Sequence, residues 1–117
     1  MKILPKAKDI IKSWTFKGFR NQKIYLYLVK PGSIGDYYGT AGIISKHVYS
    51  INLEKRNAKI IADTLIHELT HVCWYMFQKY NPKLRTSTET LALFNEAYFW
   101  KILHLYEGFM KRIRKVL

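Results

Sequence analysis

The chain has 117 residues, of which 49% are hydrophobic and 15% are aromatic, so its composition is that of a folded protein and excludes a disordered one. This length predicts a single domain over residues 1–117. The single cysteine, Cys73, excludes an internal disulfide and makes a reducing compartment the simplest expectation. Charges interrupt the N-terminal residues, and no apolar run approaches the roughly 18 residues of a membrane span, so we expect a cytoplasmic protein with no membrane partner.

The formal net charge is +12, from 20 lysine and arginine residues against 8 aspartate and glutamate residues. A surface of this sign attracts nucleic acid or acidic proteins, although scattered charges can also serve solubility alone. The densest cluster contains Lys111, Arg112, Arg114 and Lys115. These four residues would contribute most to sequence-independent binding of nucleic acid, or they would complement the dipole at a helix end.

The N-terminal segment, residues 5–19, predicts an amphipathic helix. Pro5 suits the first turn of a helix. Ile10, Ile11 and Trp14 would share one side of that helix, and the lysines would spread over the other sides, as expected for a helix at the surface.

Three strands are predicted next. Residues 23–29 have the composition and length of a strand, and residues 31–36 hold the glycine, proline and serine typical of a loop. Residues 37–44 and 46–53 predict two further strands, because valine, isoleucine and tyrosine favour extended structure. These three segments predict a small three-stranded antiparallel sheet.

The strongest helix signal extends from Asn57, a good N-cap residue, to Tyr80, which precedes the Asn-Pro pair that ends the pattern. Its apolar residues form one stripe that should face the core, and Cys73 in that stripe is interpreted as a packing residue. A second long helix is predicted from Thr86 toward Gly108. Together with the N-terminal helix and the small sheet, these elements indicate the α+β class.

The first of these two helices contains the sequence His67-Glu68-Leu69-Thr70-His71, which is an H-E-x-x-H motif. Residues four apart lie on one face of a helix, so His67 and His71 can bind one metal ion together. Glu68 is rotated by about 100° and would flank a water molecule on the metal as the general base. The motif therefore predicts a zinc hydrolase.

A catalytic zinc ion usually has three protein ligands, so a third is expected from the second helix. Glu89, Glu96 and Glu107 share one face of that helix, and His104 lies near this face. Glu89 is the first choice, although the sequence Thr86-x-x-Glu89 is also a capping box. Glu96 is the second choice, and its alternative role is to support a histidine ligand through a hydrogen bond.

Other polar side chains are candidates for supporting roles. Asp63 lies one turn before His67 and would either fix the orientation of its imidazole or interact with the helix dipole. Tyr98, Tyr106 and His104 are candidates for stabilising the oxyanion of a reacting amide, and the sequence does not distinguish among them.

The motif with a downstream glutamate resembles the gluzincin branch of the zincin metallopeptidases. Residues 64–71 are also similar to the motif helix of very small zincins, such as those predicted in bacteriophages, and of the SprT-like and ImmA/IrrE-like families. The resemblance covers residues 57–107. It implies a minimal zincin-like fold, zinc bound by His67, His71 and a later glutamate, and Glu68 as the general base.

Within this resemblance the two candidate glutamates differ. Glu89 fits the shorter spacing that the gluzincin branch shows between its second histidine and its glutamate ligand. The sequence Asn95-Glu96-Ala97 is similar to the ligand segment of the thermolysin-like peptidases, but it lies farther from the motif, and Trp100 stands where an aspartate is expected.

In zincins an edge strand beside the motif helix commonly holds the substrate as an added strand. The resemblance implies this role for residues 38–44, where Gly39, Ala41 and Gly42 would leave room for a substrate backbone. We therefore expect a monomeric zinc metallopeptidase that acts on a protein or peptide. Two alternatives remain: a basic nucleic-acid-binding domain on a zincin fold, and a zinc-stabilised protein-interaction domain with four closed ligands.

Overall fold

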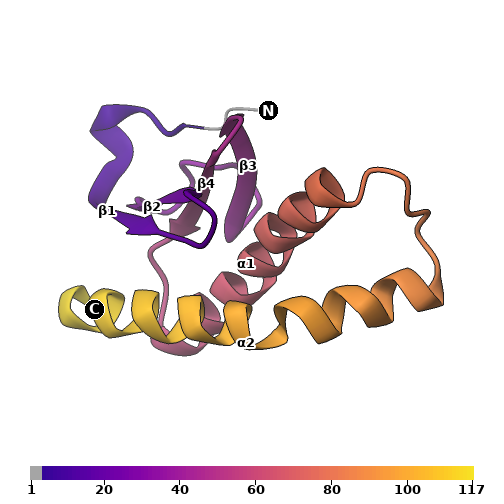
Figure 1. Ribbon diagram of the computed structural model, residues 1–117. Helices are drawn as coiled ribbons and strands as arrows, with labels where there is room; N and C mark the ends of the chain where they lie inside the picture. Colours follow the sequence, from indigo (N-terminus) through magenta and orange to yellow (C-terminus); the bar gives the residue numbers. More distant parts are fainter. Residues whose placement is uncertain (1–3) are drawn as a thin grey trace.

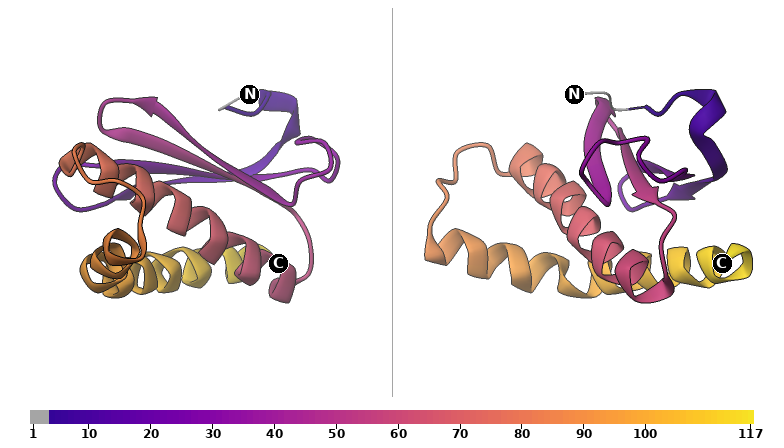
Figure 2. Two further views of the ribbon diagram at one scale, coloured as in Figure 1. Left: turned by 90° about the vertical axis from the view of Figure 1, so that its right-hand side faces the viewer. Right: turned by 180° about the vertical axis from the view of Figure 1, so that it is seen from behind.

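The computed structural model describes residues 4–117 and confirms the α+β class. A four-stranded sheet forms one layer, and two long helices cover one of its faces (Figures 1 and 2). The elements in chain order are η1 (Ala7–Asp9), β1 (Ile10–Lys17), β2 (Lys23–Val29), β3 (Gly39–Ser45), β4 (Val48–Glu54), α1 (Ala58–Tyr80), α2 (Thr88–Ile113) and η2 (Arg114–Val116).

The sheet has the strand order β1-β2-β4-β3 and is mixed. Strands β2 and β4 are parallel, whereas β1 with β2 and β3 with β4 are antiparallel. The prediction of a three-stranded antiparallel sheet was therefore wrong in strand number and in direction. The physical reason is the long loop after β2, which carries the chain past the position of β4 so that β3 becomes an edge strand.

The predicted N-terminal helix over residues 5–19 is also wrong, because this segment forms η1 and β1. Trp14 and Phe16 are two residues apart, and both pack against the core, which is the period of a strand and not of a helix. They lie opposite Leu26 and Ile24 of β2. Cross-strand packing of these aromatic rings therefore outweighed the weak helical pattern.

The β1–β2 hairpin closes through a tight two-residue turn. Arg20 and Asn21 have φ angles of 55° and 59°, and the Gln22 amide donates to the Phe19 carbonyl over 3.2 Å. Positive φ at both central positions matches the right-handed twist of the two strands. The Arg20 guanidinium lies over the ring of Tyr80 at 4.4 Å from its centroid, so the turn is attached to the end of α1.

The hydrophobic core lies between the sheet and the helices. One face of the sheet is fully apolar there, because alternate residues of β2 and β4 point toward the helices. The buried core residues of the two central strands are Ile24, Leu26, Leu28, Tyr49, Ile51 and Leu53. The helices contribute Ile61, Leu65, Leu69, Val72, Met76, Phe94, Leu105 and Phe109, among others.

Helix α1 begins and ends where the sequence predicts. The Asn57 side chain accepts a hydrogen bond from the Ile60 amide over 3.0 Å and caps the first turn. The helix ends at Tyr80, and Asn81 is its C-cap residue. Cys73 is fully buried in the core, so its interpretation as a packing residue is confirmed.

Helix α2 is longer than expected because Gly108 does not end it. An added Cβ atom at Gly108 would come within 2.6 Å of the Phe16 ring, so glycine is needed here for β1 to pack against α2. The Phe16 and Phe109 rings lie 4.6 Å apart in the same contact. Among residues 4–117, neither α1 nor α2 has the combination of length and apolar character that crossing a membrane requires.

Cys73 offers a test of this packing. Burial raises the pKa of its thiol to about 12, so the reactive thiolate is scarce at neutral pH and reagents cannot reach it. We expect iodoacetamide to label the denatured chain quickly and the native protein very slowly, as measured by mass spectrometry. Native labelling at the rate of the denatured chain would show that this part of the core is open.

Candidate metal centre

Helix α1 presents two imidazoles side by side on its exposed side. The Nε2 atoms of His67 and His71 lie 3.0 Å apart, and the rings meet at 80° with their centroids 4.7 Å apart. Partial burial, and then the neighbouring His67, lower the pKa of His71, so this imidazole is neutral at pH 7 and has a lone pair available. The pair can therefore donate two nitrogens to one cation.

Glu68 lies beside this pair but is almost completely buried, with 5% of its surface exposed. One carboxylate oxygen, Oε1, is 3.8 Å from His67 Nε2, and the other, Oε2, has no hydrogen-bond partner in the described part of the chain. Burial raises the pKa of the Glu68 carboxyl, and His67 opposes this by lowering it. An unpaired buried oxygen costs about 1–3 kcal/mol, so the Glu68 carboxyl has a hydrogen-bonding capacity that a ligand or a water molecule could satisfy.

The three residues fit a zinc ion by geometry and by chemistry. Their potential ligand atoms all lie within 4.8 Å of one another. Two nitrogens bound to tetrahedral zinc at about 2.0–2.1 Å would be roughly 3.3 Å apart, so only a small side-chain movement separates the observed pair from that geometry. Imidazole and carboxylate donors are among those that zinc prefers.

The group opens onto a groove of about 590 Å³ between α1 and the start of β3. One wall is formed by residues 37–41. The other wall is formed by the α1 residues Asp63, Thr64, His67, Glu68, His71 and Tyr75. Because β3 is an edge strand, it has a hydrogen-bonding edge that no other strand formed by residues 4–117 occupies.

Gly39 is the residue at which β3 meets α1 most closely. An added Cβ atom there would clash with Thr64 Cγ2 and would come within 3.2 Å of Glu68 Cγ. The lack of a side chain at Gly39 therefore accommodates α1, and its expected role in making room for a substrate backbone stays a prediction. Ala41 packs against the core cluster, and Ala41 and Gly42 are both partly buried in β3.

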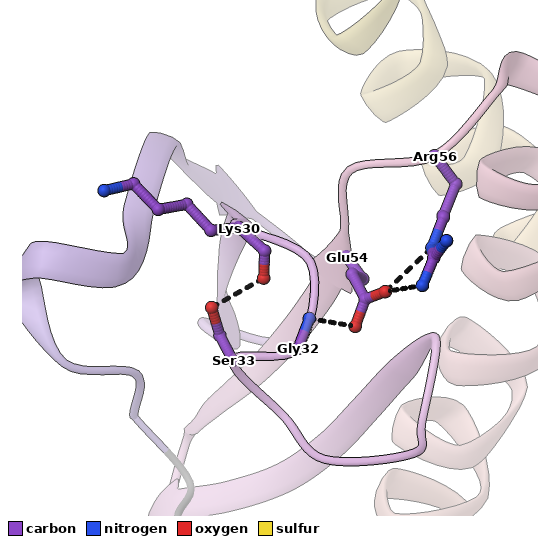
Figure 3. Close-up of polar contacts among 5 residues, drawn as sticks. All are labelled: Lys30, Gly32, Ser33, Glu54 and Arg56. Carbon is purple, nitrogen blue, oxygen red and sulfur yellow. Dashed lines mark hydrogen bonds and ion pairs between the residues drawn. The ribbon is translucent and has the colours of Figure 1, made fainter.

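The loop before β3 is held in place by a buried carboxylate. Figure 3 shows Glu54 between the loop and Arg56: its Oε2 accepts from the Gly32 amide over 3.1 Å, and its Oε1 accepts from Arg56 Nε over 2.7 Å. The Arg56 guanidinium also lies over the Tyr38 ring, 5.1 Å from its centroid. The Glu54 amide donates to the Tyr38 carbonyl over 2.9 Å. This network fixes Tyr38 at the wall of the groove.

Three tyrosines line the groove, of which Tyr38 begins the predicted substrate strand, whereas Tyr37 and Tyr75 were not predicted from the sequence. Tyr37 and Tyr38 are 67% and 51% exposed at the strand wall. Tyr75 lies one turn after His71, and the two rings stack at 22° with their centroids 6.4 Å apart. The spacing His67, His71, Tyr75 places all three on one face of the helix, which is a signal that the sequence contained.

The glutamates expected to supply a third ligand do not lie with the histidines. Glu89 and Glu96 are exposed on α2 and lie outside the one group of possible metal ligands found among residues 4–117. The face of α2 that carries them points to solvent, as the 73% exposure of Trp100 shows. The opposite face, which includes Phe94 and Tyr98, packs against the core, where these two rings stack on each other at 23°.

The alternative role of Glu89 in a capping box is wrong. The N-cap residue is Ser87 and not Thr86, and its side chain accepts from the Thr90 amide over 3.2 Å. Residues 81–87 form a loop that joins the C-terminal end of α1 to the N-terminal end of α2 (Figure 1). The first turn of α2 therefore lies away from the groove, which no residue of α2 lines.

The other candidate polar residues also lie apart from the histidines, except one. Asp63 lines the groove, but it is exposed and pairs with Lys59 over 3.0 Å. Tyr98 is buried in the core, Tyr106 packs against the core, and His104 is exposed on α2. None of these last three lines the groove, so Tyr75 is the better placed phenol.

Comparison with known proteins found no matching family model, no matching curated protein and no matching solved structure. The donor set itself indicates the chemistry. A structural zinc site has four closed protein ligands, whereas the described residues bring together only two imidazoles and one buried carboxylate beside a groove. At most three of these groups could bind a metal ion, so part of its coordination would stay open to the groove.

Replacing Gly39 with alanine tests the close approach of β3 to α1. We expect Gly39→Ala to lower the free energy of unfolding by about 1–3 kcal/mol, because the added methyl group must push the strand away from the helix. Gly18→Ala is the matched control, because a Cβ atom there meets only ordinary contacts, the nearest at 3.5 Å. Equal stability of the two variants in urea denaturation would contradict the close contact.

The positions of the glutamates give a second expectation. Glu89→Ala and Glu96→Ala should each change zinc affinity by less than the roughly 10-fold cost of losing even a group that supports a ligand. Calorimetric titration with zinc is the measurement, and His67→Ala is the positive control. A large loss of affinity for Glu89→Ala alone would show that the first turn of α2 moves to the site when metal binds.

Proposed function

We propose that the protein is a zinc-dependent metallopeptidase with a minimal zincin-like fold. The proposal assigns His67 and His71 to the metal and Glu68 to proton transfer. One observation carries it: the buried Glu68 carboxyl, with one oxygen 3.8 Å from His67 Nε2 and the other without a hydrogen-bond partner among the described residues, lies beside a pair of imidazole nitrogens 3.0 Å apart at the edge of a groove. This combination supports hydrolysis better than a purely structural metal site.

The chemistry that zinc supplies in such a site is polarisation of a carbonyl group and acidification of a water molecule. Glu68 takes a proton from the attacking water and passes it to the amine that leaves when the C–N bond breaks. Its raised pKa suits this exchange, because a base must accept a proton and then release it near neutral pH. The Tyr75 hydroxyl, which lies with Glu68 on the α1 wall of the groove, is the candidate donor to the oxyanion that forms from the attacked carbonyl group.

A peptide is the substrate that the groove fits best. The free edge of β3 can pair with an extended chain, which would be held by main-chain hydrogen bonds along one wall while its carbonyl faces α1. Tyr37 and Tyr38 add exposed aromatic surface to that wall for substrate side chains. The Glu54–Arg56 network keeps the wall in place before substrate binds.

The Glu68→Gln variant distinguishes zinc binding from peptide hydrolysis. We expect wild type to bind about one zinc ion per chain and to cleave peptides of a random library, and we expect Glu68→Gln to keep zinc and lose roughly 100-fold or more of the rate. Zinc is measured by elemental analysis and cleavage by mass spectrometry. Thr70→Ala is the control for the helix, because Thr70 is exposed on α1 and lies outside the groove.

Two results would contradict the proposal at different steps. If wild type takes up no zinc and His67→Ala behaves like wild type, the metal site is wrong. If zinc binds, and Glu68→Gln cleaves the library as fast as wild type, the assignment of Glu68 as general base is wrong.

A further inference from the structure

The sheet has a second face that points away from α1 and α2 (Figure 2, left). Ile24, Leu26 and Leu28 belong to the core, so the alternating residues of β2 lie on the opposite side. The pairing register continues this face onto β1, whose residues there are exposed. We name this surface the outer platform, and it consists of Ser13, Thr15, Lys17, Lys23, Tyr25 and Tyr27.

The outer platform carries two aromatic rings on adjacent positions of one strand. Tyr25 and Tyr27 are partly buried, lie about 7 Å apart along β2, and face small residues across the strand pair, Thr15 and Ser13. In the described part of the chain neither ring packs against another aromatic side chain. Their apolar surface is therefore presented on an open strand pair, with small polar neighbours.

The charge of this region has one sign. Residues 10–30 contain five basic residues and no acidic residue. Lys17 and Lys23 are directly opposite each other in the register of β1 and β2. Like charges in this position destabilise a sheet, and an anion between them would reverse the effect.

More cations lie toward the other end of the platform. Lys6, Lys8 and Lys30 line a pocket of about 440 Å³, and Asn52, a β4 residue in register with Tyr27, is also part of its lining. Asp9 also lines this pocket and offsets part of the charge. Lysines therefore lie at both ends of the pair of rings.

We propose that the outer platform binds single-stranded nucleic acid. Two successive bases would stack on Tyr25 and Tyr27, and the phosphates would lie near Lys17 and Lys23 at one end and Lys30 at the other. The two tyrosine rings favour single-stranded over double-stranded nucleic acid, because the bases of a duplex are stacked on each other and cannot lie flat on a protein ring. The platform and the groove lie on different faces of the sheet, so this activity does not depend on the metal site.

The test is fluorescence anisotropy of the full chain with labelled oligothymidylate and oligouridylate of about 12 nucleotides, within the usual site size of a single-strand binder. The double variant Tyr25→Ala, Tyr27→Ala should weaken binding by roughly 5- to 150-fold per ring, the range that base stacking supports. Tyr25→Phe with Tyr27→Phe should keep most of the affinity, because the rings remain. Trp100→Ala removes an exposed ring elsewhere and should change nothing.

Charge and folding need their own comparisons. Lys17→Gln with Lys23→Gln should reduce the slope of log affinity against log salt by about 1.4, since each phosphate contact on a single strand contributes about 0.7. Lys111→Gln with Lys115→Gln is the matched pair, with Lys111 in the last turn of α2 and Lys115 in η2. If the alanine variants fail to fold, Tyr25→Leu with Tyr27→Leu keeps the apolar bulk of the strand and still removes the rings.

Three results would overturn the proposal. One is equal affinity for duplex DNA and single strands at the same salt concentration, which would mean that binding depends on phosphate charge alone and not on base stacking. Another is unchanged affinity in folded variants without the two rings. The third is an equal loss of affinity for the two lysine pairs, which would place the binding on scattered surface charge.

Discussion

The close contact between Gly39 of β3 and Thr64 and Glu68 of α1 is the constraint on which the candidate site depends. A side chain larger than hydrogen at residue 39 would hold the edge strand away from the helix. With glycine there, the strand covers the Glu68 side chain, and burial follows from this contact. The same contact brings the wall of residues 37–41 to the histidines and so creates the groove. One missing methyl group thus sets both the electrostatics and the shape of the site.

The site is stabilised by parts of the protein that do not take part in its chemistry. An unpaired buried carboxylate oxygen opposes folding, and it is tolerated because the other face of α1 buries Leu65, Leu69, Val72 and Met76 completely. Glu54 shows the opposite solution for a buried carboxylate, since both of its oxygens accept hydrogen bonds (Figure 3). The two buried carboxylates therefore differ in that only Glu68 has an oxygen without a hydrogen-bond partner among the described residues.

Short sequence patterns correctly predicted the features that depend only on neighbouring residues, such as a helix cap or a shared helix face. The cap at Asn57 and the face shared by His67 and His71 are fixed within a few turns of α1, and the structure agrees with both. The segment around Trp14 was mispredicted because its apolar residues satisfy a helical and a strand period, and only the partner strand selects one. The parallel pairing of β2 with β4 and the outward face of Glu89 depend on contacts between distant segments, which no short pattern encodes.

The contact between Phe16 and the helix at Gly108 and Phe109 has a consequence for how the protein folds. This contact joins β1, near the N-terminus, to the last turns of α2, near the C-terminus. The Arg112 guanidinium adds to it by lying over the Phe16 ring, 5.2 Å from its centroid. Closing such a long loop is entropically costly and comes late, after local helices and hairpins have formed. The β1–β2 hairpin and the last turns of α2 should therefore become protected against hydrogen exchange together, as one cooperative unit.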